Sequence, residues 1–197
     1  MRKLALLGMS FLIAMTATGQ QTPIQPRDTS ALHPPPGAKV AIVEFADLEC
    51  PSCAMQNPVI TQAAEKYHVP RVWHDFPLPQ HNWSFQAAVN ARWFDSKAKK
   101  LGEDYRNAVF ANQASIESKD DLAKFTQRFA QQHGTALPFV MDPQGKLTAD
   151  VKADASLADR IGIHETPTAW VVTERGYKQV IDFKNLYSML DQAGSGR

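Results

Sequence analysis

The only two cysteines of this 197-residue chain lie three positions apart, in the segment Cys50-Pro51-Ser52-Cys53. The apolar run 40–46 before them predicts a buried strand. After them, apolar residues recur at the spacing of one helix face, at Ile60, Ala63, Ala64 and Tyr67. Cys50 is therefore expected at a strand-to-helix turn, with Pro51 at the first helical position, which proline favours.

This turn has a chemical consequence for Cys50. Free backbone N–H groups and the positive end of the helix dipole favour the thiolate over the thiol. The thiolate is the attacking species in disulfide exchange, and in such motifs its pKa lies below the free value of roughly 8.5. Cys53, one turn later, is placed to close a disulfide with Cys50 or to release a mixed disulfide. A Cys-x-x-Cys pair beside a βαβ-like pattern thus indicates redox chemistry.

Two other uses of the pair are disfavoured. No second Cys-x-x-Cys or closely spaced histidine pair completes a set of four zinc ligands, and His74 and His81 are seven positions apart. We therefore expect no metal. A disulfide that closes so short a loop restrains little of the unfolded chain, so a purely structural role is also disfavoured.

The N-terminal residues 1–19 have the layout of a secretory signal peptide. Arg2 and Lys3 precede a short apolar stretch, and Ala17 and Gly19 supply small residues for cleavage before Gln20. An uncleaved N-terminal anchor is the alternative. Cleavage removes two cations, which changes the formal net charge from +1 to −1. We expect a secreted or periplasmic protein, and such a charge gives no reason to expect a nucleic acid partner.

The rest of the mature chain predicts one domain after a proline-rich arm, residues 20–39. The segment 69–76 alternates as a second strand, and its strand–helix–strand connection implies a parallel crossover. Strand patterns then disappear from about residue 83 to 162, where helical stripes follow one another, one of them after the capping box Ser118-x-x-Asp121. Two strands around the turn at Gly176 and a closing helix complete the chain, before a tail at 193–197.

The run from Glu44 to Cys53, with Pro58 five residues beyond, resembles the active site of the DsbA-like thiol–disulfide oxidoreductases of the thioredoxin superfamily. The resemblance implies an α/β thioredoxin fold, in which helices flank a central mixed β-sheet. It covers residues 40–192, and it implies that the helical segment is an insertion between the βαβ and ββα halves.

The resemblance also implies the roles of individual residues. Cys50 is the exposed nucleophile and Cys53 resolves the mixed disulfide. Thr166 and Pro167 match the cis-proline pair that lies opposite the cysteines and shapes the substrate groove. Glu44 matches a buried carboxylate that moves protons to and from the second cysteine, although a solvated Glu44 at a sheet edge is equally compatible with the sequence.

The chain departs from this family at two points. Ser52, in the dipeptide between the cysteines, has a hydroxyl where many oxidising relatives have histidine, and Glu165 replaces a more usual glycine. Glu49 and Glu165 are expected to place negative charge near Cys50 and so to raise its pKa. His74 and His81 are interpreted as structural histidines or as groups that tune the active site.

We therefore expect an enzyme that exchanges disulfides with the thiols of exported or unfolded proteins, most simply a disulfide oxidase. Reductase or isomerase activity on the same fold, or a redox-inert peptide-binding module, are the alternatives. The Cys50–Cys53 disulfide itself is expected to be the redox group, with no other cofactor. A membrane redox partner is expected to recycle it, and the protein is expected to be a monomer.

Overall fold

A computed structural model describes residues 23–195. The predicted signal peptide, residues 1–19, lies outside this range. A mixed sheet has the strand order β2-β1-β3-β4, built from β1 (Val40–Ala46), β2 (Arg71–Asp75), β3 (Thr168–Thr173) and β4 (Gly176–Gln179). β1 pairs in parallel with β2 and antiparallel with β3, and β3 pairs antiparallel with β4. The parallel β1–β2 pair follows the predicted crossover through the intervening helix.

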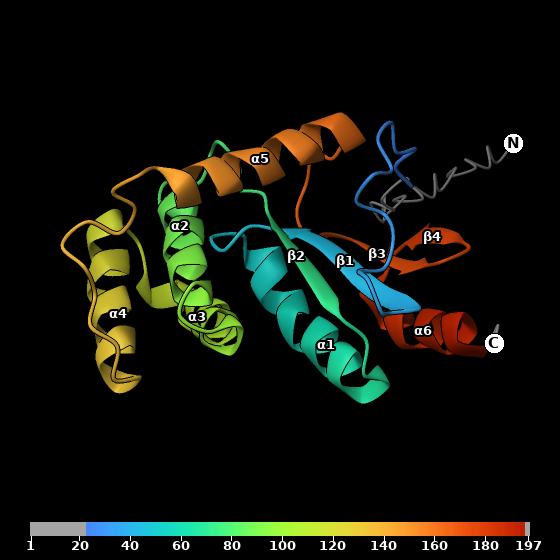
Figure 1. Ribbon diagram of the computed structural model, residues 1–197, viewed down its shortest axis with the longest axis horizontal. Helices are drawn as coiled ribbons and strands as arrows, with labels where there is room; N and C mark the ends of the chain where they lie inside the picture. The colour runs from blue at the N-terminus through green and yellow to red at the C-terminus, as the bar shows by residue number, and fades with distance from the viewer. Residues whose placement is uncertain (1–22, 196–197) are drawn as a thin grey trace, which may run out of the picture.

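Helices cover both faces of the sheet (Figure 1). Alternate residues of β1 point to opposite faces, as the two-residue period of a strand requires. Ile42 packs with α1 (Pro51–Tyr67) and α6 (Leu186–Ser195). Val43 and Phe45 pack on the other side, with α5 (Lys146–Ile161). Glu44 is two residues after Ile42 in β1, so it lies on the same face of the sheet, the face that α1 covers.

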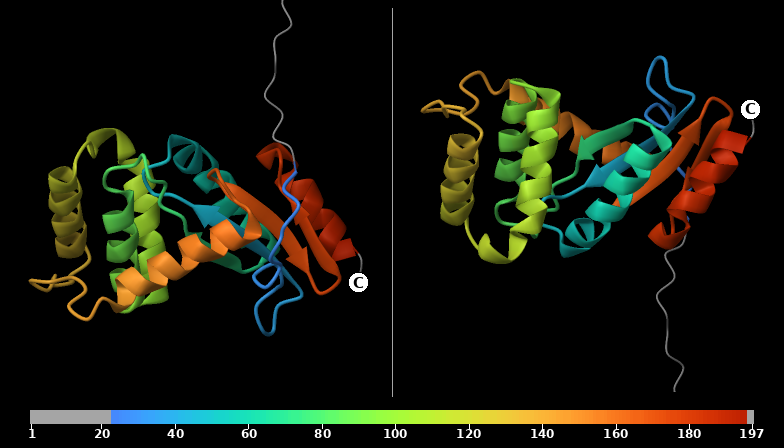
Figure 2. Two further views of the ribbon diagram at one scale, coloured as in Figure 1. Left: turned by 90° about the horizontal axis from the view of Figure 1, so that it is seen from above. Right: turned by 90° about the horizontal axis from the view of Figure 1, so that it is seen from below.

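The helical insertion lies between β2 and β3 in the chain and stands beside the sheet (Figures 1 and 2). Its first three helices are α2 (Ser84–Asp95), α3 (Lys99–Ala111) and α4 (Lys119–Gln132), and the short 3-10 helix η1 (Gln113–Ser115) lies between α3 and α4. We call α2, α3 and α4, with η1, the helical block. Its core contains Trp83, Phe94 and Phe129, and Cys50 and Cys53 belong to the same buried cluster. The block therefore forms one wall of the cysteine site.

The two ends of the described chain pack on the domain. In the arm, Leu32 is buried against the α5 face, and the N–H of Arg27 donates to the carbonyl of Ile161 over 3.1 Å. The 3-10 helix η2 (Phe183–Asn185) leads into α6, which continues to Ser195, so residues 193–195 are helical where the sequence predicted a tail. Within residues 23–195, none of the helices has the length and apolar character of a membrane span.

Local signals of the sequence mark the helix ends. α1 begins after Cys50 with Pro51 at its first position. Ser118 caps α4, since its hydroxyl oxygen accepts a hydrogen bond from the N–H of Asp121 over 3.1 Å. This bond satisfies one of the unpaired N–H groups at the start of the helix.

We expect Ser118→Ala to lower the free energy of unfolding by about 1 kcal/mol, because the cap is lost. Urea denaturation of the reduced protein measures this. Ser156→Ala is the matched control, because Ser156 is exposed within α5, where alanine suits a helix. Equal stability of the two variants would contradict the capping role.

Candidate active site

Cys50 is the N-cap residue of α1, and no side chain caps this helix start. When Cys50 is ionised, the backbone N–H groups of Ser52 and Cys53 help to stabilise its thiolate. On its other side, the Cys50 thiol donates to the carbonyl of Thr166, with 3.3 Å between sulfur and oxygen. The sulfur thus lies between the start of α1 and the loop that precedes β3.

Cys53 lies one turn further into α1 and is 1% exposed. Its sulfur accepts a hydrogen bond from the backbone N–H of Asp47 over 3.5 Å. Both cysteines are thiols in this structure. Of the dipeptide between them, Pro51 and Ser52 are both exposed. Cys50 is 7% exposed, so the expectation of an exposed Cys50 is wrong, because the Thr166 loop and the helical block cover it. The two cysteines differ in their hydrogen-bond partners although they are close in sequence.

These environments separate the two thiol pKa values. The hydrogen bond from Cys53 is the main influence that lowers the pKa of Cys50 to about 5, and contacts with Thr166 and the helix N–H groups add to it against the opposing effect of burial. Burial raises the pKa of Cys53 far above its ordinary range, and the neighbouring Cys50 thiolate and Glu44 carboxylate add to the increase. Cys50 is thus the thiolate and Cys53 the proton-bearing partner.

Glu49 was expected to raise the pKa of Cys50, but that pKa is lowered and Glu49 is not among the main influences on it. The Glu49 carboxylate accepts hydrogen bonds from three backbone N–H groups at the start of α2, those of Asn82 over 3.1 Å, Trp83 over 2.6 Å and Ser84 over 2.9 Å. Its charge is compensated there by the positive end of a second helix. Glu165 is exposed to solvent, which screens its charge.

The loop before β3 lies against Cys50 as the resemblance implied. The peptide bond between Thr166 and Pro167 is cis. A groove of about 890 Å³ begins at this loop and at Ser52 and extends to β4 and α6. Polar side chains form most of its lining, among them Gln56, Lys178, Asp182, Asn185 and Gln192. The groove therefore begins at the loop whose Thr166 carbonyl contacts the Cys50 sulfur.

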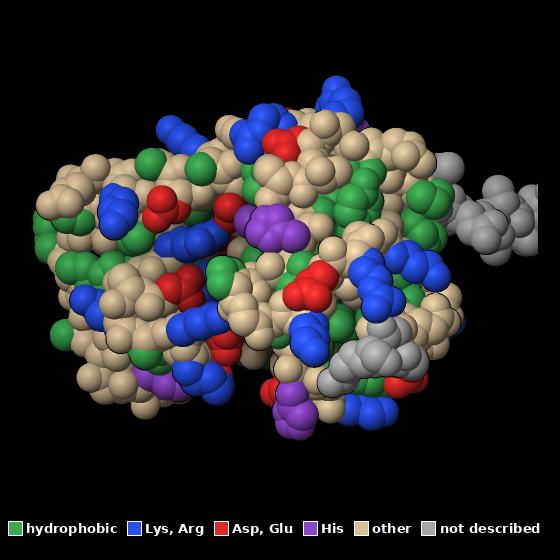
Figure 3. Space-filling view, turned by 45° about the vertical axis from the view of Figure 1, so that its right-hand side comes forward, with side chains coloured by type: hydrophobic (Ala, Val, Ile, Leu, Met, Phe, Trp, Pro, Cys, Tyr) green, Lys and Arg blue, Asp and Glu red, His purple; other side chains and the backbone are tan. Residues whose placement is uncertain are grey.

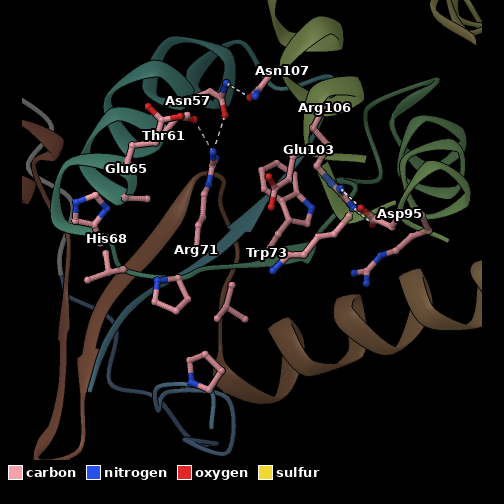
Figure 4. A pocket seen from close by; sticks show the side chains of 17 residues that line it. Asn57, Thr61, Glu65, His68, Arg71, Trp73, Asp95, Glu103, Arg106 and Asn107 are labelled. Carbon is pink, nitrogen blue, oxygen red and sulfur yellow. Dashed lines mark hydrogen bonds and ion pairs between the residues drawn. The ribbon is translucent and has the colours of Figure 1, made fainter. Parts of the chain in front are cut away.

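Glu44 is 1% exposed, so the solvated alternative considered from the sequence does not apply. One carboxylate oxygen accepts from Arg71 Nε over 2.7 Å, while Oε1 is buried and has no hydrogen-bond partner among the described residues. Arg71 also donates from Nη1 to Asn57 and to Thr61, each over 2.9 Å, and Asn57 donates to Asn107 of α3 (Figure 4). The carboxylate beside Cys53 is therefore a partner in a buried ion pair.

Arg71 also lines a cavity of about 780 Å³ between α1, β2 and the helical block. Its guanidinium lies 5.2 Å from the centre of the Trp73 ring, and that of Arg106 lies 5.4 Å from it. Figure 4 shows these side chains around the cavity, and Figure 3 shows acidic and basic side chains where the surface is hollowed beside the helical block. Arg71 thus connects the buried Glu44 to this open pocket.

Several residues of the site had no signal in the sequence. Asp47 contacts both cysteines through its backbone, and its buried carboxylate holds the segment before α2. Gln113 of η1 donates to the carbonyls of Leu48 over 2.8 Å and Cys50 over 3.1 Å, which ties the helical block to the motif. In the described part of the chain, no group of three or more His, Cys, Asp or Glu is arranged to hold a metal ion.

Comparison with known proteins agrees with this geometry. A family model described as Thioredoxin matches residues 35–192, and the chain belongs to this family. The expected thioredoxin fold with a helical insertion is confirmed, in the form that DsbA proteins have. The Wolbachia pipientis protein alpha-DsbA1 superposes with a TM-score of 0.66 at 20% identity, over 83% of this chain and 90% of that protein.

Two further relatives show the breadth of the family. A periplasmic thioredoxin-like protein from Salmonella enterica serovar Typhimurium superposes with a TM-score of 0.63 at 16% identity, over 82% of this chain and 88% of that one. In sequence, the chain is 28% identical over 160 residues to the Na(+)/H(+) antiporter NhaA 3 of Salinispora tropica. That match covers 76% of this chain, which spans only 22% of the antiporter's length.

The pKa of Cys50 gives a test of the site. Because its pKa is lowered to about 5, Cys50 is a thiolate above that pH, and its alkylation by iodoacetamide is expected to be half-maximal near pH 5. Cys53→Ser keeps a hydroxyl donor to Cys50, whereas Cys53→Ala removes the donor. We therefore expect a higher Cys50 pKa in the alanine variant than in the serine variant. Equal pH profiles would contradict the hydrogen bond as the main cause.

Proposed function

We propose that the protein is an exported thiol–disulfide oxidoreductase that oxidises the thiols of other exported or unfolded proteins. The observation that supports this most is the contrast between the two cysteines. Cys50 has a pKa of about 5, and the pKa of the buried Cys53 is raised. A stabilised thiolate at the attacked position favours the dithiol form of the pair, so its disulfide is a good oxidant.

The proposed reaction has two exchanges. A substrate thiolate attacks the Cys50 sulfur of the Cys50–Cys53 disulfide. The disulfide bond breaks, its electron pair leaves on the Cys53 sulfur, and that sulfur takes up a proton. A second substrate thiolate then attacks the substrate sulfur of the mixed disulfide, and Cys50 leaves as a thiolate. The substrate loses two electrons and gains a disulfide, while the pair becomes a dithiol.

In this proposal Glu44 supplies the proton to Cys53 and accepts it in the reverse direction, through water. Its nearness is supported by the effect of its charge on the Cys53 pKa. Arg71 offsets the cost of keeping this carboxylate buried. Since Arg71 also lines the cavity beside β2, it provides a polar surface along which protons exchange with solvent.

Thr166 and Pro167 are proposed to bind the substrate. They border both Cys50 and the groove that leads to α6. An extended substrate segment would pair with the backbone of Thr166 and present its cysteine to Cys50. The pair Cys50–Cys53 is proposed to be the redox group, with no other cofactor.

The remaining parts of the proposal concern the setting of the protein. Similarity to a periplasmic thioredoxin-like protein supports an exported location. A membrane redox partner is proposed to return the dithiol to the disulfide, and the protein is proposed to act as a monomer.

A reductase or isomerase on the same fold is the second candidate. Ser52 provides no positive charge beside the cysteines, which favours a less oxidising pair. A redox-inert binding module would use the same groove without exchange. Alkylation of Cys50 would then leave peptide binding unchanged.

The equilibrium constant of the Cys50–Cys53 pair with glutathione tests the proposed function. An oxidase is expected to have a reduction potential near roughly −120 mV, whereas a value near roughly −270 mV would indicate a reductase. Cys50→Ser is expected to abolish oxidation of a reduced protein substrate such as hirudin. If the wild type had no reversible couple, or if Cys50→Ser retained activity, the proposal would be wrong.

Glu44→Gln tests the proposed proton transfer. We expect closure of the Cys50–glutathione mixed disulfide by Cys53 to slow by about 10²-fold at neutral pH, because the proton acceptor for Cys53 is lost. Rapid acid quenching with mass spectrometry measures this step. The control is Glu174→Gln, an exposed position in the turn between β3 and β4, which should leave the rate unchanged. An unchanged rate in Glu44→Gln would rule out the role of Glu44.

A further inference from the structure

Asp47, in the loop between β1 and α1, is the residue that contacts both cysteines through its backbone. Its N–H donates to the Cys53 sulfur over 3.5 Å, and its carbonyl accepts from the N–H of Cys50 over 3.1 Å. Its side chain is 0% exposed, and its carboxylate is therefore a buried negative charge next to the cysteine pair. An uncompensated charge there would disfavour the Cys50 thiolate.

This carboxylate contacts one basic side chain among the described residues. It accepts hydrogen bonds from the N–H of Glu49 over 2.7 Å, from the N–H of Leu78 over 2.6 Å and from the Ser84 hydroxyl. The fourth partner is His81, whose Nδ1 lies 2.7 Å from Asp47 Oδ2. The His81 side chain is 18% exposed, so it can exchange protons with solvent while the carboxylate stays buried.

Among the described residues, the other charged groups close to His81 are not placed to compensate the Asp47 carboxylate. The carboxylates that face this segment from the β1–α1 loop are those of Asp47 and Glu49. Glu49 is bound by the first N–H groups of α2, starting with the residue after His81. Pro51 and Ser52, between the cysteines, have no charge. Among the described residues, His81 is therefore the basic side chain that can compensate the Asp47 charge when it is protonated.

The distances make this compensation effective. The 2.7 Å contact from His81 to Asp47, the length of one aspartate and the 3.5 Å contact from Asp47 to Cys53 together place His81 within about 10 Å of the Cys53 sulfur, which lies next to that of Cys50. At an effective dielectric constant of about 20, one charge at about 10 Å shifts a pKa by roughly one unit.

We propose that protonated His81, held by the buried Asp47, is a positioning residue that stabilises the Cys50 thiolate and shifts the redox couple toward the dithiol. The role is electrostatic and is supplied from the segment before α2, because the dipeptide between the cysteines has no cation. This inference rests on the proposed disulfide exchange and identifies a group that sets its direction.

Two variants of His81 separate charge from shape. His81→Gln keeps an N–H donor for Asp47 but removes the charge, and His81→Lys keeps a charge. We expect the Cys50 pKa to rise by about one unit in the glutamine variant. Alkylation measured over about three pH units on either side of the transition gives this pKa. The equilibrium constant with glutathione should shift about tenfold toward the disulfide. Lysine should restore both values toward those of the wild type.

The matched control is His74→Gln. His74 forms a similar pair, with 2.8 Å between its Nδ1 and Asp154 Oδ1, but it stacks on Phe45 on the α5 face of the sheet. This variant should leave the Cys50 pKa unchanged. An unchanged pKa in His81→Gln, or equal shifts in the glutamine and lysine variants, would overturn the electrostatic role.

A double variant guards against a loss of folding. Asp47→Asn together with His81→Gln removes both charges, so the Cys50 pKa should return toward the wild-type value, whereas a damaged loop would leave it raised. Circular dichroism checks that each variant is folded. The failure of this inference is distinct from failure of the proposed function, which would show as the absence of a reversible couple in the wild-type protein.

Discussion

The unpaired N–H groups at the start of α1 are the feature on which the rest of the site depends. A helix start leaves backbone donors without partners, and here no side-chain oxygen satisfies them. Cys50 occupies the N-cap position, where the hydrogen bond from the Cys53 thiol is the main influence that lowers its pKa and the N–H groups of Ser52 and Cys53 add to it. The same turn buries Cys53 one helical turn later, so one local structure gives the two thiols opposite proton affinities.

Buried charges surround this turn, and each has a partner from another part of the chain. Arg71 of β2 pairs with Glu44, and His81 pairs with Asp47. A buried carboxylate without such a partner would be costly, so these pairs are conditions for keeping charge close to the cysteines. Arg71 and His81 both come from the segment between α1 and α2, whose strand β2 pairs with β1. The insertion thus belongs to the site as much as to the fold.

The elements with strong local patterns were predictable. The apolar run before Cys50, the helical stripes of residues 83–162 and the Ser118 cap all appear as expected, because each depends on residues close in sequence. The contributions of Asp47 and Gln113 were not predictable, since their hydrogen bonds join residues up to 65 positions apart. Glu49 is likewise not among the main influences on the Cys50 pKa, because its hydrogen-bond partners are at the start of α2.

By itself, the sequence determined the position of the redox motif, the strand–helix unit around it and the presence of a helical segment before Thr166. These follow from periodicity, capping and spacing, which act over one or two helical turns. Only the tertiary structure decided that Glu44 is buried with Arg71, that Glu49 caps α2 and that His81 meets Asp47. Charge effects depend on distance and burial in space, and sequence separation contains neither quantity.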